Sequence, residues 1–457
     1  MSSAVPTLNE EGKKRRFWNW LQVGLGYALG YYLLRYSLPV VETKIGASLH
    51  LGAPEMGDVK GVGKGVYALF AVLIGFFADR IGGKKVMVVG LWGAGCMSIL
   101  LALAGFIEWH NSTHAFTYLM LVWVVNNAFQ ACGALSIIAI NRSWFHYAER
   151  GKLSGAFGAI IQSGRVSVGV LGILLFTVFK APWYVMFLVP GIATVVFRYL
   201  IQHHVYNTPR EAGIDYDVDV GNTEDQSFNS LSEWGRIKAV LGGILASGAG
   251  VKIMIGEFCT GFVRSGTEDW FVRYMQEVFH VNLKNPGMMF TLILCPIAAV
   301  CGGFTGGWAT DRLFGSRRGP VLTLAYIGQA ICLLFLGQVT SLFDASIVLV
   351  ANAFFVQITH GLLTGVTSMD VGGKTGAAMA AGIFDACQYA AGMVGGMVIG
   401  RLVYHWGWGA WSLCMIIFPI VAAVVMSTLP KVHSRPTRPE AQVRPAITAL
   451  PAVAKTG

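Results

Sequence analysis

Charged residues are scarce in this sequence. Asp, Glu, Lys and Arg together make up 13% of the 457 residues, whereas hydrophobic residues make up 54%. The mean hydropathy is +0.57. Soluble chains carry about 25% charged residues, which cover their surface. The shortage of charge excludes an ordinary soluble globular protein and indicates a chain whose surface lies largely in lipid.

Patterns that carry catalytic or metal chemistry are also missing. The sequence supports no Ser-His-Asp arrangement, no metal-ligand cluster and no phosphate-binding loop of the ATPase kind. Its eight cysteines lie in apolar stretches without metal-type pairing, so we interpret them as packing residues. No cleavable signal peptide precedes the first apolar run. We therefore predict a protein that is not an enzyme, has no catalytic residues, needs no metal or cofactor, and draws its energy from gradients.

Apolar stretches long enough to cross a bilayer recur along the chain. A helix needs about 20 apolar residues to span the hydrocarbon core. The sequence predicts an all-α polytopic membrane protein with twelve transmembrane helices, near residues 18–41, 59–78, 86–107, 117–141, 153–177, 182–202, 248–274, 288–309, 319–340, 346–369, 376–402 and 407–429. Glycine is abundant, at 57 residues, which suits helices that pack closely in lipid.

The predicted spans fall into two six-helix bundles, at residues 18–202 and 248–429. The segment between them, residues 203–247, is polar and acidic and is predicted to be a cytoplasmic linker. Residues 1–17 are predicted to form a cytoplasmic amino tail. Residues 430–457 are rich in Pro and Ala, which predicts a disordered cytoplasmic tail.

The net charge of +10 comes mostly from short loops and the two tails. A basic surplus can indicate a nucleic-acid partner, but here its placement follows the positive-inside rule. Basic clusters lie in the amino tail, after the second, fourth, eighth and tenth spans, in the linker, and in the carboxyl tail. With twelve spans all these segments lie on one side. We therefore predict cytoplasmic termini, the lipid bilayer as a partner, and no nucleic acid.

One motif occurs at matching places in the two halves. After the second span it consists of Gly75, Asp79, Arg80 and Gly83. After the eighth span, 232 positions later, it recurs as Gly307, Asp311, Arg312 and Gly315. Glycine permits close helix approach, and an Asp with flanking bases can form a charge network that breaks and reforms as helices move. The alternative is a generic positive-inside loop, which the matched spacing disfavours.

This motif resembles the signature of the major facilitator superfamily, and the resemblance covers the whole twelve-helix plan. It implies two pseudo-symmetric six-helix bundles with a substrate site near the membrane midplane between them. It also implies rocker-switch alternating access, in which one bundle rocks against the other, and a monomer.

Two arginines lie at membrane depth in equivalent helices. Arg35 is in the first span and Arg264 in the seventh, at an offset of 229 that is close to the offset of the repeated motif. An ionised group at this depth costs several kcal/mol unless it is paired or faces water. Guanidinium groups on both sides of a pseudo-twofold axis can grip an anion through bidentate bonds. The alternative for Arg264 is neutralisation by Glu257 or Glu268 on its own helix.

Segments around both arginines resemble a narrower family. Residues 264–278 (RSGTEDWFVRYMQEV) look like the seventh helix of the bacterial glycerol-3-phosphate transporters, of the organophosphate:phosphate antiporter family. Residues 26–35 (GYALGYYLLR) resemble their first helix, and residues 208–213 the start of their central loop. The resemblance implies that Arg35 and Arg264 bind a phosphoryl group, that inorganic phosphate is the exchanged ion, and that the protein lies in a bacterial inner membrane.

The resemblance weakens at other positions. Ile161 stands where the glycerol-3-phosphate carriers have a histidine, and Ala71 stands where they have a lysine. Their proline-bearing segment in the fourth helix is replaced by residues 134–137 (ALSI). The resemblance therefore implies recognition of phosphate without implying glycerol 3-phosphate itself.

Two further charges lie at a similar depth in the fifth and eleventh spans. Arg165 follows Gln162 on one face of its helix, and we predict either substrate contact or an ion pair with Asp385. For Asp385 we predict contact with a cationic group of the substrate, as in an aminophosphonate, because it is an acid in a cavity rich in positive charge. Such a role predicts that Asp385→Asn changes the selectivity between amino and non-amino substrates.

The remaining candidates are polar residues near these charges. Lys64 either faces the cavity or snorkels outward. His360 either contacts phosphate or is a structural hydrogen-bonding group. Tyr389 matches a family tyrosine, and Tyr32 precedes Arg35 by three positions.

The sequence as a whole predicts a secondary transporter of a small organophosphate or phosphonate anion, in exchange for inorganic phosphate. One alternative is a proton-coupled symporter of another organic anion, with Asp385 or His360 as the proton carrier. The other is a membrane sensor that binds a phosphorylated ligand without transporting it.

Overall fold

The computed structural model describes residues 8–145, 150–215 and 232–429. Each of the twelve predicted spans coincides with a helix or a run of helices, and no strand occurs in these ranges. The predicted carboxyl tail at 430–457, part of the linker and residues 1–7 of the amino tail fall outside them. The division into domains therefore stays a prediction.

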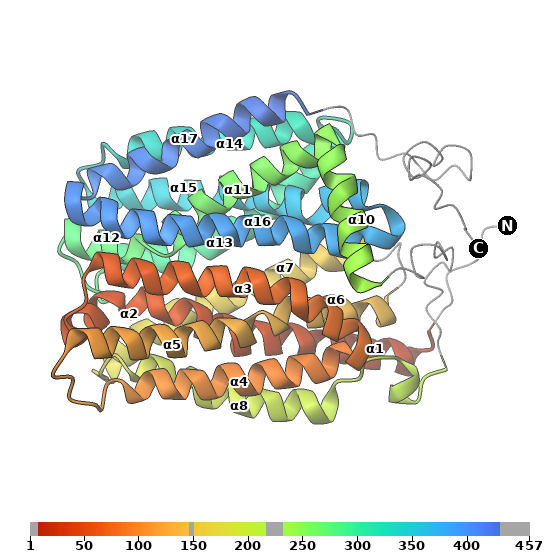
Figure 1. Cartoon of the computed structure of the whole chain (residues 1–457), viewed down its shortest axis with the longest axis horizontal. Coiled ribbons are helices and arrows are strands. Elements are labelled where there is room, and N and C mark those ends of the chain that lie inside the picture. Colours follow the sequence, from red (N-terminus) through yellow and green to blue (C-terminus); the bar gives the residue numbers. More distant parts are fainter. Residues whose placement is uncertain (1–7, 146–149, 216–231, 430–457) are drawn as a thin grey trace, which may run out of the picture.

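The helices of the amino-terminal half run antiparallel to one another (Figure 1). They are α1 (Glu10–Leu25), the π-helical η1 (Gly26–Tyr32), α2 (Leu33–Leu49), α3 (Ala53–Ile81), α4 (Gly83–Leu103), α5 (Ser112–Gln130), α6 (Cys132–Trp144), α7 (Arg150–Ile173), the π-helical η3 (Leu174–Val178) and α8 (Val185–His204).

The carboxyl-terminal half repeats this plan. Its helices are α10 (Glu233–Ala246), α11 (Gly248–Glu268), α12 (Phe271–Val278), α13 (Pro286–Arg312), α14 (Arg318–Leu336), α15 (Leu342–His360), the π-helical η5 (Gly361–Thr367), α16 (Ser368–Trp406) and α17 (Gly409–Ser427).

Polar residues set the start of several helices. Asn111, Asn285 and Ser341 each accept a hydrogen bond from an amide in the first turn of α5, α13 and α15. Such caps satisfy amide groups that have no partner inside the helix. Pro286 follows Asn285 at the first position of α13, where its missing N–H costs nothing.

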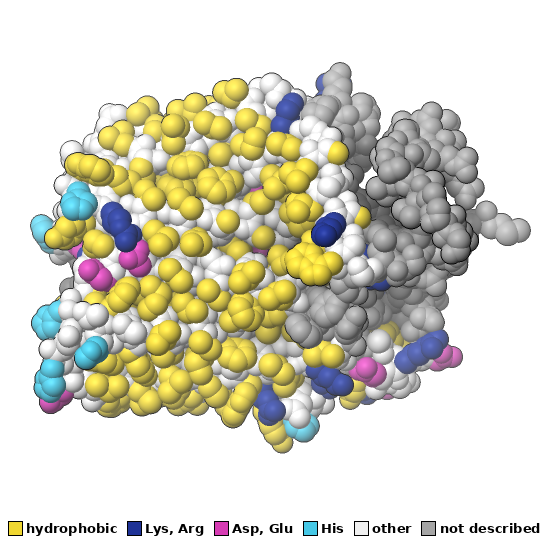
Figure 2. Space-filling model, in the orientation of Figure 1, with side chains coloured by type: hydrophobic (Ala, Val, Ile, Leu, Met, Phe, Trp, Pro, Cys, Tyr) yellow, Lys and Arg dark blue, Asp and Glu magenta, His cyan; other side chains and the backbone are white. Residues whose placement is uncertain are grey.

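The outer surface of the bundle matches a lipid environment. Nine helices of the described ranges are long and apolar enough to cross a membrane, and α10 with α11 forms a further, bent candidate. Figure 2 shows a broad apolar surface along the helices, with charged and histidine side chains gathered towards the two ends. Exposed residues such as Leu121 and Leu413 contribute to this apolar surface. The chain is therefore a multi-pass membrane protein.

Helix α10 was not predicted from the sequence. It lies across one end of the bundle and meets α11 at a bend of 96° (Figure 1). Ile244 is buried, whereas Trp234 is 69% exposed. Its apolar and polar residues are mixed within a segment that the sequence assigned to a linker, which explains why it was missed.

Among the described residues, the most extensive contacts between the two halves are those of α3 with α16, α7 with α13, and α2 with α12. The α3–α16 contact is built from two facing glycine stripes, each with a spacing of four residues. They are Gly57, Gly61 and Gly65 on α3 and Gly392, Gly396 and Gly400 on α16. A Cβ atom at Gly61 would lie 2.6 Å from the carbonyl oxygen of Met393. Glycine therefore lets the two backbones touch.

For the alternating access that the sequence predicts, Gly61→Ala should impair transport while leaving the fold intact. The added methyl group meets backbone rather than a flexible side chain, and such overpacking costs about 1–3 kcal/mol. The substrate exchange rate should therefore fall about tenfold to a hundredfold. Gly303→Ala is the matched control, because its Cβ would meet only the Gln357 side chain at 3.7 Å. Equal exchange rates for the two variants in proteoliposomes would contradict this expectation.

Candidate anion-binding site

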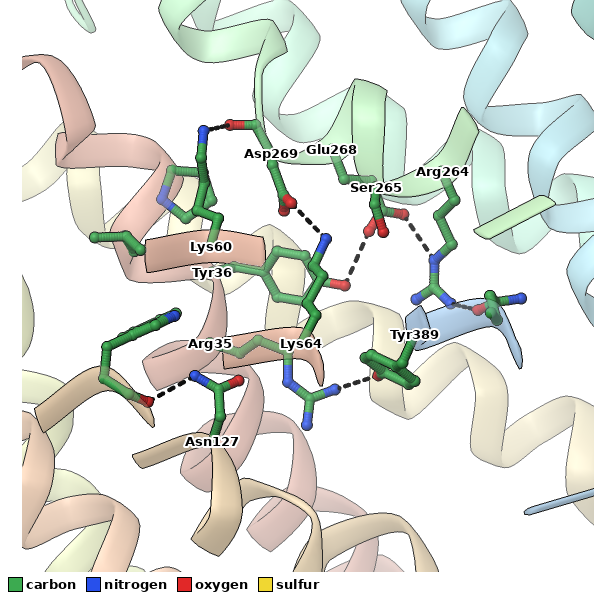
Figure 3. Close-up of a pocket in the computed structure, with 14 residues that line it drawn as sticks. Arg35, Tyr36, Lys60, Lys64, Asn127, Arg264, Ser265, Glu268, Asp269 and Tyr389 are labelled. Carbon is green, nitrogen blue, oxygen red and sulfur yellow. Dashed lines mark hydrogen bonds and ion pairs between the residues drawn. The ribbon is translucent and has the colours of Figure 1, made fainter. Parts of the chain in front are cut away.

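A cavity lies where the two halves face each other near the middle of the bundle (Figure 3). Its free volume is about 40 Å³, room for two or three water molecules by the same measure. Its lining residues come from both halves: Arg35, Tyr36, Leu38, Pro39, Lys60, Lys64, Trp123, Asn127, Arg264, Ser265, Glu268, Asp269, Gln388 and Tyr389. A phosphate-sized anion therefore requires these side chains to move apart.

Arg35 lines the cavity without an acidic partner. Its Nη1 atom donates to the Tyr389 hydroxyl at 3.0 Å, and its guanidinium lies 4.6 Å from the centre of the Tyr67 ring and 5.4 Å from that of Tyr32. Its Nε and Nη2 atoms are buried and have no hydrogen-bond partner in the described ranges. An aromatic ring stabilises a cation much less than an anionic partner does. Arg35 is therefore a buried cation with free donors.

Tyr389→Phe should weaken phosphate binding about tenfold. The change removes the hydrogen bond from Arg35 Nη1 to the Tyr389 hydroxyl, and bonds to charged groups contribute about 1.5–3 kcal/mol. Tyr31→Phe is the matched control, because its hydroxyl donates to the Met87 carbonyl at 2.9 Å outside the cavity lining. Calorimetric titration with phosphate measures the affinity of both variants. Unchanged affinity in Tyr389→Phe would show that this hydrogen bond does not position Arg35.

Arg264 and Arg165 share a single carboxylate. Glu268 Oε1 lies 3.2 Å from Arg264 Nε and 2.8 Å from Arg165 Nη1, and its Oε2 accepts from Tyr36 at 3.0 Å. Arg264 Nη1 also donates to Gln388 Oε1 at 2.7 Å. The expected local neutralisation of Arg264 by Glu268 is therefore present, but one acid serves two arginines.

The partner predicted for Arg165 was wrong. The sequence suggested Asp385, because the fifth and eleventh helices are equivalent in the two halves, but the ion pair forms with Glu268 of α11. Arg165 also lies 4.8 Å from the centre of the Tyr36 ring. Gln162 accepts a long hydrogen bond of 3.4 Å from Arg165 and donates to Gln357 of α15 at 3.2 Å. This pair thus links the two halves beside the cavity.

Asp385 makes no hydrogen bond or ion pair among the described residues, but it lies within electrostatic reach of Arg35 and Arg264. His360 joins the Arg264 network, because its Nε2 is 3.3 Å from Arg264 Nη1. Lys64 faces the cavity and forms an ion pair with Asp269, so it does not snorkel outward.

Sequence reasoning missed a second charged group between the cavity and one end of the bundle. Glu42 of α2 is fully buried and binds Lys60 of α3 at 2.8 Å and Arg273 of α12 at 3.0 Å. Lys60 also donates to the Asp269 carbonyl at 3.3 Å, and its ammonium lies 3.2 Å from the centre of the Trp270 ring. These contacts join the two halves. All three charges lie near predicted span ends, where they resemble ordinary interfacial residues.

The repeated motif is only partly described. Gly75, Asp79 and Arg80 belong to a stretch of α3 whose side chains the structure does not describe. Asp311 and Arg312, at the end of α13, are exposed. Gly83 packs tightly, since a Cβ there would lie 2.6 Å from the Ser136 carbonyl oxygen. The predicted switching network stays a prediction.

The charges around the cavity favour an anion. Among the described residues, Glu268 pairs with Arg165 and Arg264, Arg35 has no acid, and Lys64 is neutralised by Asp269. Two positive charges therefore remain when the other nearby acids, Glu257 and Asp385, are neutral. They balance the two negative charges of a phosphate monoester dianion. Arginine forks suit such an oxyanion because they donate two parallel hydrogen bonds.

Comparisons with known proteins agree with this fold. The family model of the Major Facilitator Superfamily matches residues 23–395. The glycerol-3-phosphate transporter of Bacillus subtilis (strain 168) is 24% identical over 429 residues, covering 91% of this chain and 92% of the relative. The membrane sensor protein UhpC of Escherichia coli (strain K12) is 22% identical over 435 residues, covering 90% of this chain and 92% of the relative.

Solved structures give the same fold. A bacterial homolog to the human lysosomal transporter Spinster, in an inward-facing and unoccupied conformation, has a TM-score of 0.72 at 16% identity, covering 92% of this chain and 98% of that chain. The xylose transporter XylE from E. coli, in a partially occluded inward open conformation, has a TM-score of 0.66 at 17% identity, covering 90% and 97%.

Proposed function

The chain belongs to the major facilitator superfamily, and from that premise we propose that it is a secondary transporter that exchanges a small organophosphate or phosphonate anion for inorganic phosphate. The observation that carries the proposal is the Arg35 guanidinium, whose Nε and Nη2 atoms are buried and meet neither a hydrogen-bond acceptor nor an acid among the described residues. Arg264 lines the same cavity from the other half. The relative named a glycerol-3-phosphate transporter supports a phosphorylated substrate.

The proposed mechanism couples anion binding to movement of the halves. An anion held by Arg35 and Arg264 neutralises both and draws the halves together, which lowers the barrier to reorientation. Without an anion the unneutralised arginines must move through a low-dielectric interior, so the empty carrier reorients slowly. Exchange, rather than one-way transport, follows from this difference.

We further propose that the protein lies in a bacterial inner membrane as a monomer, with both termini in the cytoplasm. The described start of α1 and the end of α17 point towards the same end of the bundle (Figure 1). That end is the more basic one. Its turns and adjoining helix starts carry Lys84, Lys85, Arg317 and Arg318, whereas the turns at the other end carry Lys180 and Lys284 beside His50, His110, His280 and His405. The positive-inside rule assigns the basic end to the cytoplasm.

Exchange in proteoliposomes tests the proposed function. Purified protein is reconstituted with internal phosphate, and uptake of radiolabelled external phosphate is compared with protein-free liposomes. We expect rapid uptake that unlabelled organophosphates or phosphonates inhibit, and the strongest competitor identifies the organic substrate. Adding aminophosphonates to the panel tests whether Asp385 selects a cationic group. Absence of exchange by well-folded protein would contradict the proposal.

Two alternatives give different results in the same vesicles. A proton-coupled symporter would accumulate an organic anion when a pH gradient is imposed without internal phosphate. A membrane sensor would bind phosphorylated ligands in detergent but catalyse no exchange, and the relative named a membrane sensor protein supports that alternative.

A further inference from the structure

Glu257 is a buried acid that the proposed exchange mechanism does not use. It lies on α11, two turns before Arg264, and its side chain is fully buried. Its Oε1 accepts from the Thr364 hydroxyl at 2.7 Å and its Oε2 accepts from Gln388 Nε2 at 2.8 Å. Both donors are neutral, and no ion pair reaches Glu257 in the described ranges. An ionised carboxylate at membrane depth without a cation is costly and favours binding a proton.

Titratable groups on four helices lie around Glu257. They are Arg264 on its own helix, Asp385 and Cys387 on α16, His360 on α15 and Tyr326 on α14. Gln388 separates Glu257 from Arg264, because its Oε1 accepts from the guanidinium while its Nε2 donates to the carboxylate. Glu257 is thus connected to the anion site without being neutralised by it.

His360 is poorly placed to carry a proton. Arg264 Nη1 lies 3.3 Å from its Nε2, and Gln388 Nε2 lies 2.9 Å from its Nδ1. A protonated imidazole donates from both nitrogens, so its Nε2 would face the Arg264 donor, whereas its Nδ1 could donate to the Thr364 hydroxyl oxygen at 3.2 Å. The neutral ring instead accepts a hydrogen bond on one side, and the extra proton is left to a carboxylate.

Charge links Glu257 to anion binding. Glu257 and Asp385 lie within electrostatic reach of each other, so the ionisation of one disfavours that of the other. If both acids were ionised, they would cancel the two positive charges left by the three arginines and Glu268. The cavity attracts a dianion most strongly when these acids are neutral.

We propose that Glu257 is a proton-binding site, and that its carboxylate takes up one proton from water when an anion binds Arg35 and Arg264. The inference rests on the proposed anion site. No other bond changes in this step, because the neutral acid keeps its place between Thr364 and Gln388. By linkage the effect is reciprocal, so a lower pH increases phosphate affinity.

Calorimetry of phosphate binding in two buffers of different ionisation enthalpy measures proton uptake per bound anion. Wild type should take up about one more proton than Glu257→Gln at a pH where Glu257 is ionised in the unliganded protein. The number of protons that phosphate itself gains or loses on binding is the same for both proteins, so it cancels in the difference. Glu257→Gln should still bind phosphate, because the amide mimics the protonated acid in shape and charge.

Thr364→Val provides a second variant. It removes a donor that stabilises the carboxylate, so Glu257 is already protonated in more molecules and proton uptake should fall below that of wild type. Equal proton uptake by wild type and Glu257→Gln, with both binding phosphate, would overturn this inference alone. Loss of the extra proton in Asp385→Asn but not in Glu257→Gln would also overturn it. Failure of wild type to bind phosphate would overturn the proposed function and this inference together.

Discussion

Arg35→Ala is expected to weaken phosphate binding several hundredfold while making the unliganded protein more stable. The guanidinium donates to Tyr389 but leaves Nε and Nη2 buried without partners. A buried charge without an acid destabilises the unliganded protein, so its removal should raise the melting temperature. Loss of a bidentate contact to an anion should cost about 3–4 kcal/mol of binding free energy, which is a loss of affinity of several hundredfold.

Two variants separate this role of Arg35 from a structural one. Arg35→Lys keeps the charge but lacks the fork, and we expect an affinity between those of wild type and Arg35→Ala. Arg198→Ala is the control, since Arg198 packs 5.6 Å from the centre of the Trp92 ring on the outer side of α8. Phosphate titration and thermal unfolding measure both effects. An Arg35→Ala variant that binds phosphate within twofold of wild type, or that melts earlier, would contradict the assignment.

Glu42→Gln is expected to open one end of the bundle, where the group formed by Glu42, Lys60 and Arg273 (the Glu42 group) joins the two halves. The carboxylate is fully buried and binds both Lys60 and Arg273. Removing one partner of a buried ion pair leaves an uncompensated charge and costs about 3–5 kcal/mol. Opening this end would let water reach Lys60 and would relieve this cost. The ratio of open to closed molecules should therefore rise about a hundredfold or more, because each 1.4 kcal/mol changes an equilibrium by roughly tenfold.

Hydrogen–deuterium exchange of α2 and α12 measures this opening. Glu277→Gln is the matched control, because Glu277 also binds Arg273, at 2.7 Å, but its side chain is 38% exposed. Exposed ion pairs contribute about 0–1 kcal/mol, so the control should exchange like wild type. Exchange that is equal in all three proteins would show that the buried Glu42 group does not hold the two halves together.

Apolar periodicity and the repeated motif predicted most of the fold. The twelve spans coincide with helical runs, and the resemblance to the major facilitator superfamily is confirmed. The resemblance to glycerol-3-phosphate transporters is also confirmed, at 24% identity to one of them. The π-helical segments and helix α10 were not predicted, because backbone geometry and the bend at α10 depend on tertiary packing.

Four of the nine predicted site residues line the cavity, whereas Tyr32, Gln162, Arg165, His360 and Asp385 do not, and a role in binding stays a prediction for all nine. Arg35, Arg264, Lys64 and Tyr389 line one cavity, as expected from charges at membrane depth and equivalent helices. The partner of Arg165 was wrong, because which acid faces which base depends on helix rotation, and sequence spacing does not fix rotation between helices. The Glu42–Lys60–Arg273 group was missed because each charge alone resembles an interfacial residue.

Trans-stimulated efflux tests the central claim, that an anion shared by the two halves permits reorientation. Proteoliposomes are loaded with radiolabelled phosphate and diluted into medium with or without unlabelled phosphate. We expect fast efflux only when external phosphate is present, because the empty carrier with unneutralised arginines reorients slowly. Efflux at the same rate into both media would contradict the claim, since the empty carrier would then return as readily as the loaded one.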